Sequence, residues 1–173
     1  MQAGNEAAME ALVHRYHRPI YAYLYRLTGR REAAEDLAQE CFIRLMTRIR
    51  EYNPAQPFRP WFYTIAHNLY KDHCRAAEQR AHPAAEPLSP EVPAPIDLTE
   101  RIAEQAEVAV AVGALAEGER EVLVLRYWGD LKVDQIAAAT GLPAGTVKSR
   151  LFHAVQKLKR ALLDPAPARR NQA

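Results

Sequence analysis

The distribution of prolines constrains this chain more than any other feature. Five of its twelve prolines fall in the stretch HPAAEPLSPEVPAPI, residues 82–96. Proline fixes φ and removes a backbone donor, so this density excludes regular helix and favours an extended, semi-rigid linker. We therefore predict a linker over residues 81–96 that joins two parts, residues 1–80 and 97–163, and a disordered tail over 164–173.

Both parts show apolar residues at helical spacing, and neither shows the alternation typical of a strand. In the first part, Pro19 suits the first turn of a new helix and the proline-rich segment 53–60 suits a loop, which predicts helices over 6–17, 19–29, 33–52 and 61–80. In the second part, Asp97 and Glu100 resemble a capping box, which predicts helices over 97–112, 119–127, 133–139 and 144–163. The predicted fold class is all-α, with two small helical domains joined by the linker.

The composition excludes several classes of protein. The N-terminus has no basic segment followed by an apolar run, and no apolar stretch approaches the roughly 20 residues that span a bilayer. Two cysteines, Cys41 and Cys74, are no disulfide framework and fit a reducing compartment. We expect a cytoplasmic protein that does not insert into a membrane.

The segment VDQIAAATGLPAGTVKSRLFHAVQKLKRAL predicts a helix-turn-helix. Gly141 falls where a tight turn needs positive φ, and Pro143 permits a second helix to begin. A stripe in that second helix is predicted to be buried: Val147, Leu151, Val155, Leu158 and Leu162. The second helix of this motif enters the DNA major groove.

The other faces of the second helix suit nucleic acid. Thr146, Ser149, Arg150 and His153 lie away from the buried stripe, and lysines 148, 157 and 159 flank it. No acidic residue occurs between Asp134 and Asp164, although the net charge of the whole chain is only +2. Attraction to phosphate requires such a surface of one sign. The alternative is a helical hairpin with a solvated lysine face.

A second candidate site combines aromatic and basic residues in NPAQPFRPWFYTIAHNLYKDHCR. Aromatic rings beside cations suit single-stranded nucleic acid, because bases stack on the rings while cations follow the backbone. Helical spacing predicts that Trp61, Phe62, Ile65 and Leu69 belong to the core. The better candidates for binding are then the loop from Asn53 to Phe58, and the residues Asn68, Lys71 and Arg75.

The helix over 33–52 presents an unusual outer face. Leu37, Cys41 and Leu45 share a face that suits a core, which leaves a different set pointing outward: Asp36, Gln39, Glu40 and Ile43. A solvated face more often alternates its charges and omits the isoleucine. The pattern therefore raises the possibility of a docking surface.

Catalytic and metal chemistry find little support in the sequence. There is no nucleophile with a base at motif spacing, no glycine-rich phosphate loop and no convincing carboxylate pair. The histidines and cysteines match no common zinc spacing. We expect no enzyme activity, no metal and no cofactor.

The order of these motifs resembles a bacterial sigma factor of the extracytoplasmic-function (ECF) group, in the sigma-70 family. AEDLAQECF is similar to the D-x-x-Q-E-x-F pattern of its region 2, and FRPWFYTIAHNLYKDHCR is similar to the family's next motif, with Phe62 for the usual leucine. LAEGEREVLVLRYW and QIAAATGLPAGTVKSRL are similar to region 4, with Gln135 for the usual glutamate.

The resemblance implies partners and roles. Asp36, Gln39, Glu40 and Ile43 would bind the clamp helices of the largest subunit of core RNA polymerase, and region 4 would meet the flap of the second-largest subunit. The minus-ten strand of promoter DNA would contact Asn53, Phe58, Arg59, Asn68, Lys71 and Arg75. The minus-thirty-five duplex would contact Thr146, Lys148, Ser149 and His153, with Arg150 and Lys157 nearer the backbone. The family also implies an anti-sigma factor.

Two other readings stay open at this level. A stand-alone helix-turn-helix regulator would bind duplex DNA without polymerase, usually as a dimer. An enzyme with a small helical metal site would retain metal on purification.

Overall fold

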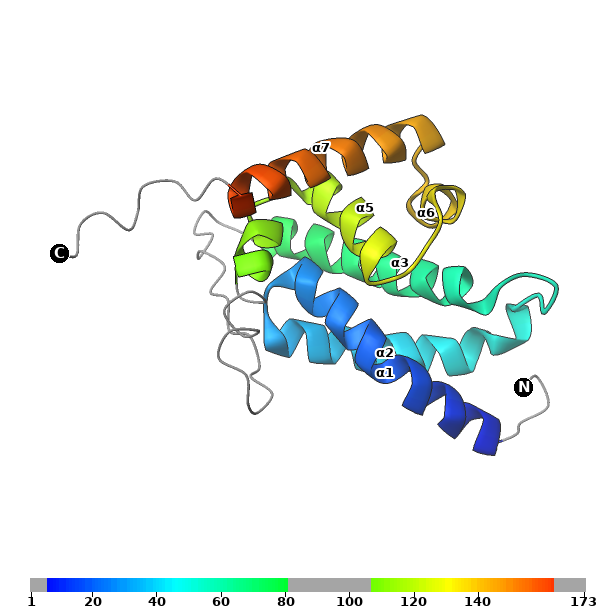
Figure 1. Cartoon of the computed structure of the whole chain (residues 1–173). Coiled ribbons are helices and arrows are strands. Elements are labelled where there is room, and N and C mark those ends of the chain that lie inside the picture. The colour runs from blue at the N-terminus through cyan, green and yellow to red at the C-terminus, as the bar shows by residue number, and fades with distance from the viewer. Residues whose placement is uncertain (1–5, 81–106, 164–173) are drawn as a thin grey trace.

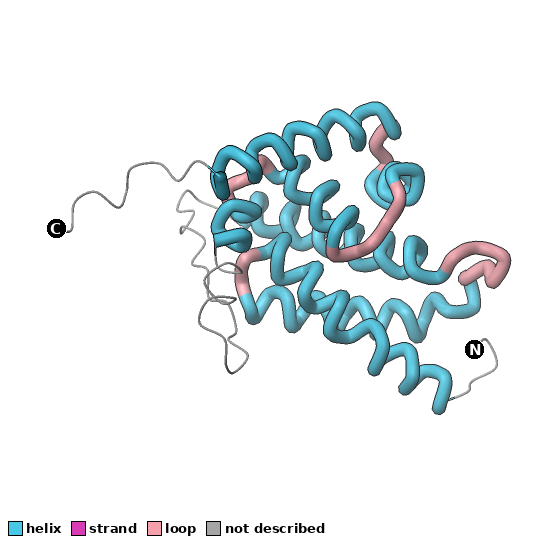
Figure 2. The backbone as a smooth tube through the Cα atoms, viewed as in Figure 1, coloured by secondary structure: helices cyan, strands magenta, loops and turns pink. Residues whose placement is uncertain are grey.

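Helices form all the regular structure that the computed structural model describes, which covers residues 6–80 and 107–163 (Figures 1 and 2). The N-terminal half contains α1 (Glu6–Thr28), α2 (Arg31–Arg48), the 3-10 turn η1 (Ile49–Glu51) and α3 (Phe58–Arg80). The C-terminal half contains a helical stretch over 107–113, then α5 (Glu117–Tyr127), α6 (Val133–Thr140) and α7 (Ala144–Leu163). The all-α prediction is confirmed. The predicted linker, the Asp97–Glu100 capping box and the tail lie outside the described residues.

The predicted break at Pro19 is wrong, because α1 runs through the proline. Proline inside a helix costs about 3 kcal/mol or more, since it removes a hydrogen bond and crowds the preceding turn. Burial offsets this cost: Ile20, Tyr23 and Leu24 are fully buried just after the proline. Each such side chain contributes roughly 1.5–3 kcal/mol when it leaves water.

The helix predicted from residue 61 begins earlier, at Phe58. Pro60 fits because the first turn of a helix has no intrahelical acceptors for its N–H groups. The Phe58 ring lies 5.3–5.7 Å, centroid to centroid, from the rings of Tyr16, Tyr52, Trp61 and Phe62. These contacts fix the start of α3 against α1 and the preceding loop.

The turn between α6 and α7 has the predicted form. Gly141 adopts φ 72°, and its amide donates to the carbonyl of Ala137, which closes α6. At the other end of α6, Gln135 accepts from the Lys132 amide at 2.9 Å. Of the predicted stripe on α7, Val147 is buried and Leu151, Val155 and Leu158 are half-buried. Leu162 in the last turn is 38% exposed, so the stripe ends before it.

The two halves pack against each other. In the first half, α2 and α3 contact each other, and both contact α1. In the second half, α5 and α6 contact α7. The halves meet where α3 touches α6 and where α1 touches α5 (Figure 1). One apolar cluster includes Tyr23, Phe62 and Leu45 from the first half and Leu125, Ile136 and Val147 from the second. No described helix is both long and apolar enough to cross a membrane.

Candidate docking and nucleic-acid-binding surfaces

The outer face of α2 combines charge with exposed apolar area. Asp36 and Gln39 are exposed, and Glu40 is half-buried and accepts from the Nε of Arg44 at 2.9 Å. Ile43 is 50% exposed, and Met46, which sequence analysis missed, is 51% exposed three residues further along. We call these five residues the α2 outer face. Helical spacing from Ile43 would have found Met46, because residues three apart lie on one side.

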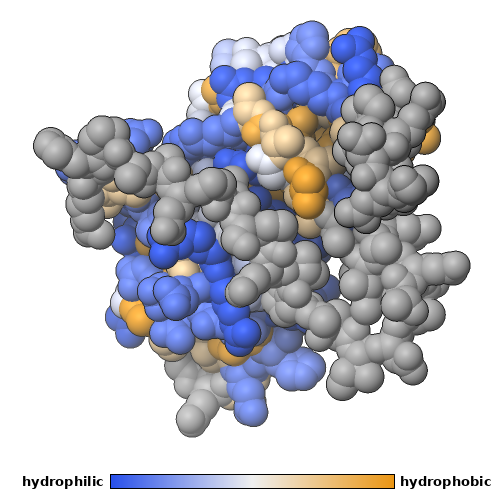
Figure 3. Space-filling model, turned by 90° about the vertical axis from the view of Figure 1, so that its left-hand side faces the viewer, coloured by the Kyte–Doolittle hydropathy of each residue, from blue (hydrophilic) through white to orange (hydrophobic). Residues whose placement is uncertain are grey.

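The opposite side of α2 explains this orientation. Leu37, Ala38, Cys41 and Leu45 are all at most 8% exposed and belong to the apolar cluster. Their burial fixes the rotation of α2, so the outer face has nowhere to pack within the described residues. The coloured surface in Figure 3 is largely hydrophilic, with a few apolar patches. Ile43 and Met46 are two of seven large apolar side chains that are exposed among the described residues.

The six residues proposed for single-stranded DNA follow the length of α3 and do not form one cluster. Asn53 lies in the preceding loop, where its side chain accepts from the Ala55 amide at 3.0 Å. From Phe58 to Arg75 the helix rises about 25 Å at 1.5 Å per residue. Asn68 and Arg75 are exposed, and Lys71 is half-buried. This spacing suits an extended strand better than a compact ligand.

The predicted duplex-facing residues lie on the exposed side of α7. Lys148, Ser149 and His153 are exposed, and Thr146 is half-buried. Phe152, which sequence analysis missed, is 61% exposed, and its ring lies 5.6 Å from that of His153. Phe152 falls outside the buried stripe of α7, and that mismatch is the signal that would have found it.

Two members of the α7 set have other neighbours. Lys157 donates to both carboxylate oxygens of Glu119 on α5, each at 2.8 Å. Arg150 is half-buried and lines a cleft shared with Asn68, Lys71 and Arg75 of α3. The structure therefore brings one residue proposed for the duplex together with three proposed for the single strand.

Known proteins resemble both halves. A family model of sigma-70 region 2 matches residues 12–80, and one of sigma-70 region 4 matches residues 105–158. The ECF RNA polymerase sigma factor SigW of Bacillus subtilis is 30% identical over 95% of this chain and 94% of its own length. SigL of Mycobacterium tuberculosis, also an ECF RNA polymerase sigma factor, is 32% identical over 94% and 93%. The chain belongs to the ECF sigma factors.

Other matches agree with this assignment. The chain spans 64% of the ECF sigma factor BldN of Streptomyces coelicolor, at 31% identity. Among solved structures, CnrH in complex with the cytosolic domain of CnrY matches with a TM-score of 0.69 and 27% identity, over 94% of this chain and 92% of that one. The sigma factor RpoE of Bartonella quintana, in complex with the anti-sigma factor NepR, has the same fold, with a TM-score of 0.72 at 19% identity over 90% and 97%.

In this sigma factor, acids of the C-terminal half hold cations of α3. Lys71 donates to Glu117 at 2.9 Å and to Glu121 at 3.1 Å, and Arg59 donates to Asp130 at 2.8 Å. Tyr63 donates to the Trp128 carbonyl at 3.4 Å. Two of the cations proposed for the single strand are therefore already paired with carboxylates of region 4.

The ion pairs that Lys71 makes with Glu117 and Glu121 are partly protected from water. Glu121 is 5% exposed, and burial raises the pKa of its carboxyl against the opposing effect of Lys71. Burial lowers the pKa of Lys71, but its hydrogen bonds to the two glutamates outweigh this effect and the pKa is raised overall. Proximity to Lys71 lowers the pKa of the more exposed Glu117. Lys71 is thus held in its charged form.

His67 is a buried histidine beneath this pair. Its Nδ1 lies 3.3 Å from the Tyr23 hydroxyl, and Lys71 and Glu117 are the charged groups nearby. Burial, helped by the charge of Lys71, lowers the pKa of His67 to about 4. In the part of the chain that the structure describes, no three His, Cys, Asp or Glu side chains gather as metal ligands would.

We expect the free energy of unfolding of this sigma factor to decrease as the pH is lowered, because of His67. The unfolded chain binds a proton near pH 6.5, whereas the folded chain binds it only near pH 4. The stabilising effect is therefore complete above pH 6.5 and is lost as the pH falls from 6.5 to 4. The free energy of unfolding should decrease by up to about 3 kcal/mol over this range. Urea unfolding between pH 7.5 and 4.5 measures this loss.

His67→Gln should flatten the dependence of unfolding free energy on pH, and an unchanged slope would contradict the assignment. His73→Gln, which removes an exposed histidine of the same helix, is the control.

Proposed function

We propose that this ECF sigma factor binds core RNA polymerase through the α2 outer face and directs it to promoters. The observation that carries the proposal is the combination of Asp36, Gln39 and Glu40 with the half-exposed Ile43 and Met46 on one side of α2. Charged groups orient a partner and speed its approach, and apolar area at the centre of a contact contributes affinity. The matched polymerase surface would be the clamp helices of the largest subunit, with the flap of the second-largest subunit meeting region 4.

Promoter recognition is divided between the two halves in this proposal. The exposed side of α7 reads the minus-thirty-five duplex through Thr146, Lys148, Ser149 and His153, joined by Phe152. Because α7 carries no acidic residue, its surface attracts the phosphates of DNA. The loop at Asn53 and the α3 residues Phe58, Arg59, Asn68, Lys71 and Arg75 bind the melted minus-ten strand. The protein acts in the cytoplasm as a regulator and has no catalytic role of its own.

An anti-sigma factor is part of the proposal. CnrH and RpoE, which share this fold, were both solved with a protein partner, and the RpoE partner is an anti-sigma factor. A partner that covered the α2 outer face would bury Ile43 and Met46 and exclude polymerase. The matching partner would carry basic and apolar side chains.

Gel filtration with core RNA polymerase tests the proposed function directly. We expect the sigma factor to co-elute with polymerase at one copy per enzyme and to permit initiation at a subset of promoters. Failure of the folded protein to co-elute, together with tight binding to duplex DNA as a dimer, would favour the stand-alone regulator.

The contacts between the halves predict that the free protein binds single-stranded DNA with reduced affinity, because carboxylates of the second half already pair with cations of α3. Glu117→Gln with Glu121→Gln removes the carboxylates that hold Lys71 and should raise affinity for a minus-ten oligonucleotide about three- to tenfold, since ion pairs contribute modestly. Fluorescence anisotropy at fixed salt measures the change. Glu119→Gln with Glu10→Gln is the matched control, because it removes the same charge, Glu119 pairs with Lys157 and not with α3, and Glu10 is an exposed acid of α1. Equal effects of the two changes would contradict the prediction.

A further inference from the structure

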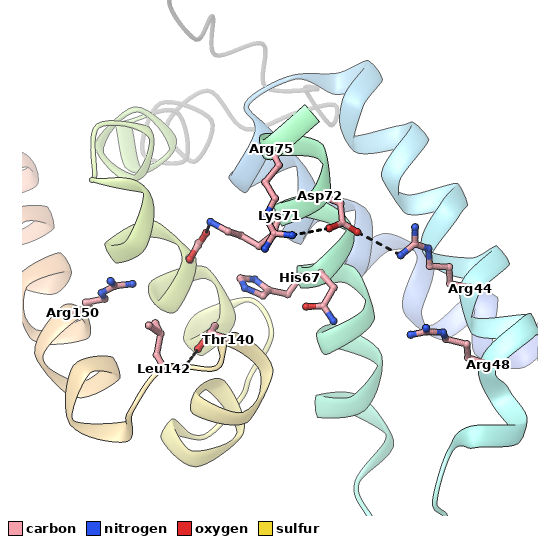
Figure 4. Close-up of a pocket in the computed structure, with 11 residues that line it drawn as sticks. Arg44, Arg48, His67, Lys71, Asp72, Arg75, Thr140, Leu142 and Arg150 are labelled. Carbon is pink, nitrogen blue, oxygen red and sulfur yellow. Dashed lines mark hydrogen bonds and ion pairs between the residues drawn. The ribbon is translucent and has the colours of Figure 1, made fainter. Parts of the chain in front are cut away.

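A cleft of about 620 Å³ lies between the two halves (Figure 4). Arg44 and Arg48 project into it from α2 on one side, and Arg150 of α7 projects from the opposite side. Lys71 and Arg75 of α3 lie between them, with Asn68. The cleft therefore exists only while the halves are packed together, and its volume is in the range of sites for small molecules.

Positive charge dominates the lining of the cleft. Five cationic side chains face only two carboxylates, Asp72 and Glu121. His67 also lines the cleft and is neutral at pH 7, because burial lowers its pKa to about 4. The lining residues thus carry a net charge of +3. Three carboxylates outside the lining pair with its cations: Glu40 with Arg44, Glu51 with Arg48 and Glu117 with Lys71. An excess of positive charge in a hollow concentrates anions when these pairs exchange.

The ion pairs that these arginines already make are exchangeable. Arg44 pairs with Glu40 at 2.9 Å and Asp72 at 3.9 Å, Arg75 pairs with Asp72 at 3.3 Å, and Arg48 pairs with Glu51 at 3.9 Å. Every side chain in these pairs is at least 37% exposed. Exposed pairs contribute little net free energy, so a ligand with several negative charges can replace the carboxylates.

Arg150 is the cation of the cleft with the fewest constraints. No ion pair or side-chain hydrogen bond among the described residues involves Arg150, and its guanidinium lies against Gly118 at the start of α5. A side chain at position 118 would meet this guanidinium, because an added Cβ would lie 2.5 Å from its Nη1.

We propose that this cleft binds a small compound with several phosphate groups, such as a polyphosphate or a nucleoside polyphosphate. Arginine is suited to phosphate because its planar guanidinium donates two parallel hydrogen bonds. Contacts from α2, α3 and α7 to one ligand would hold the two halves together. This binding would also occupy Lys71 and Arg75. If these residues bind the minus-ten strand, as the proposed function states, the ligand would oppose capture of that strand.

Titration calorimetry of the full chain with inorganic triphosphate tests the proposal. We expect saturable binding at physiological salt, weakened about tenfold by Arg48→Gln and again by Arg44→Gln, since each change removes a charge-assisted contact. Arg31→Gln is the matched control: it removes the same charge from an exposed arginine at the far end of α2 and should change affinity less than twofold. Circular dichroism verifies that the variants fold.

Two outcomes would overturn the proposal. The first is absence of triphosphate binding; if a mixed-sequence single-stranded oligonucleotide then binds with the expected variant pattern, the cleft binds nucleic acid instead. The second is an equal loss of affinity in Arg31→Gln and Arg48→Gln, which would indicate that the charge acts diffusely and not at the cleft. Co-elution with core polymerase is measured on the same preparation, so that failure of the cleft proposal is separated from failure of the proposed function.

Discussion

Replacing Asp36, Gln39 and Glu40 together with alanine is expected to abolish co-elution with core RNA polymerase and leave the fold intact. The three side chains are exposed or half-buried, so their loss leaves the core untouched. Truncation of central contacts commonly costs about 2 kcal/mol or more for each dominant residue, so the affinity should fall at least 100-fold. Gel filtration and promoter-dependent transcription measure the effect.

The matched control for that triple variant removes the same net charge elsewhere. Glu10 and Glu78 are exposed acids on α1 and α3, and alanine at both should leave polymerase binding within about twofold, because exposed charges away from a contact act weakly. Ile43→Ala with Met46→Ala tests the apolar part of the same face. Normal transcription by the folded triple variant would refute the docking role of α2.

Ser149→Ala with His153→Ala is expected to change preference at the minus-thirty-five element without changing preference at the minus-ten element. A specific base contact contributes about 1–3 kcal/mol of discrimination, so losing two contacts should reduce selectivity by tenfold or more. A library of promoter variants, transcribed by the reconstituted holoenzyme, reports the preference at each base.

Lys159→Gln supplies the comparison for the base-reading residues. Lys159 is an exposed cation on α7, and a contact to phosphate there would weaken all promoters alike and reduce the salt dependence. If the Ser149 and His153 changes also weakened every promoter equally, α7 would hold the backbone without reading sequence. Phe152→Ala belongs in the same series, because an exposed aromatic ring can contact the methyl group of thymine.

Local chemistry made some of these features predictable. The spacing of Leu37, Cys41 and Leu45 was enough to orient α2, and Gly141 with Pro143 was enough to place the turn before α7. Pro19 misled the prediction because its local cost is outweighed by the burial of Ile20 and Tyr23, which depends on partners far along the chain. The same holds for the pairing of Arg59 with Asp130, since the two are 71 residues apart and no periodicity relates them.

The cleft shows this limit most clearly. Sequence analysis does not single out Arg44 and Arg48, and it predicts Arg150 only as a residue near the DNA backbone. Only the packing of α3 against α6 brings them around one space. Such arrangements follow from tertiary contacts between halves, which helical spacing alone does not encode.

The burial of Cys41 beneath the α2 outer face has a consequence for redox chemistry. Its thiol is fully buried, and burial raises its pKa to about 12, so almost no reactive thiolate forms near neutral pH. Burial also raises the pKa of Cys74, the other cysteine. Peroxide reacts with exposed thiolates, and the buried Cys41 thiol offers none. Oxidation of Cys41 would therefore require α2 to separate from the core first.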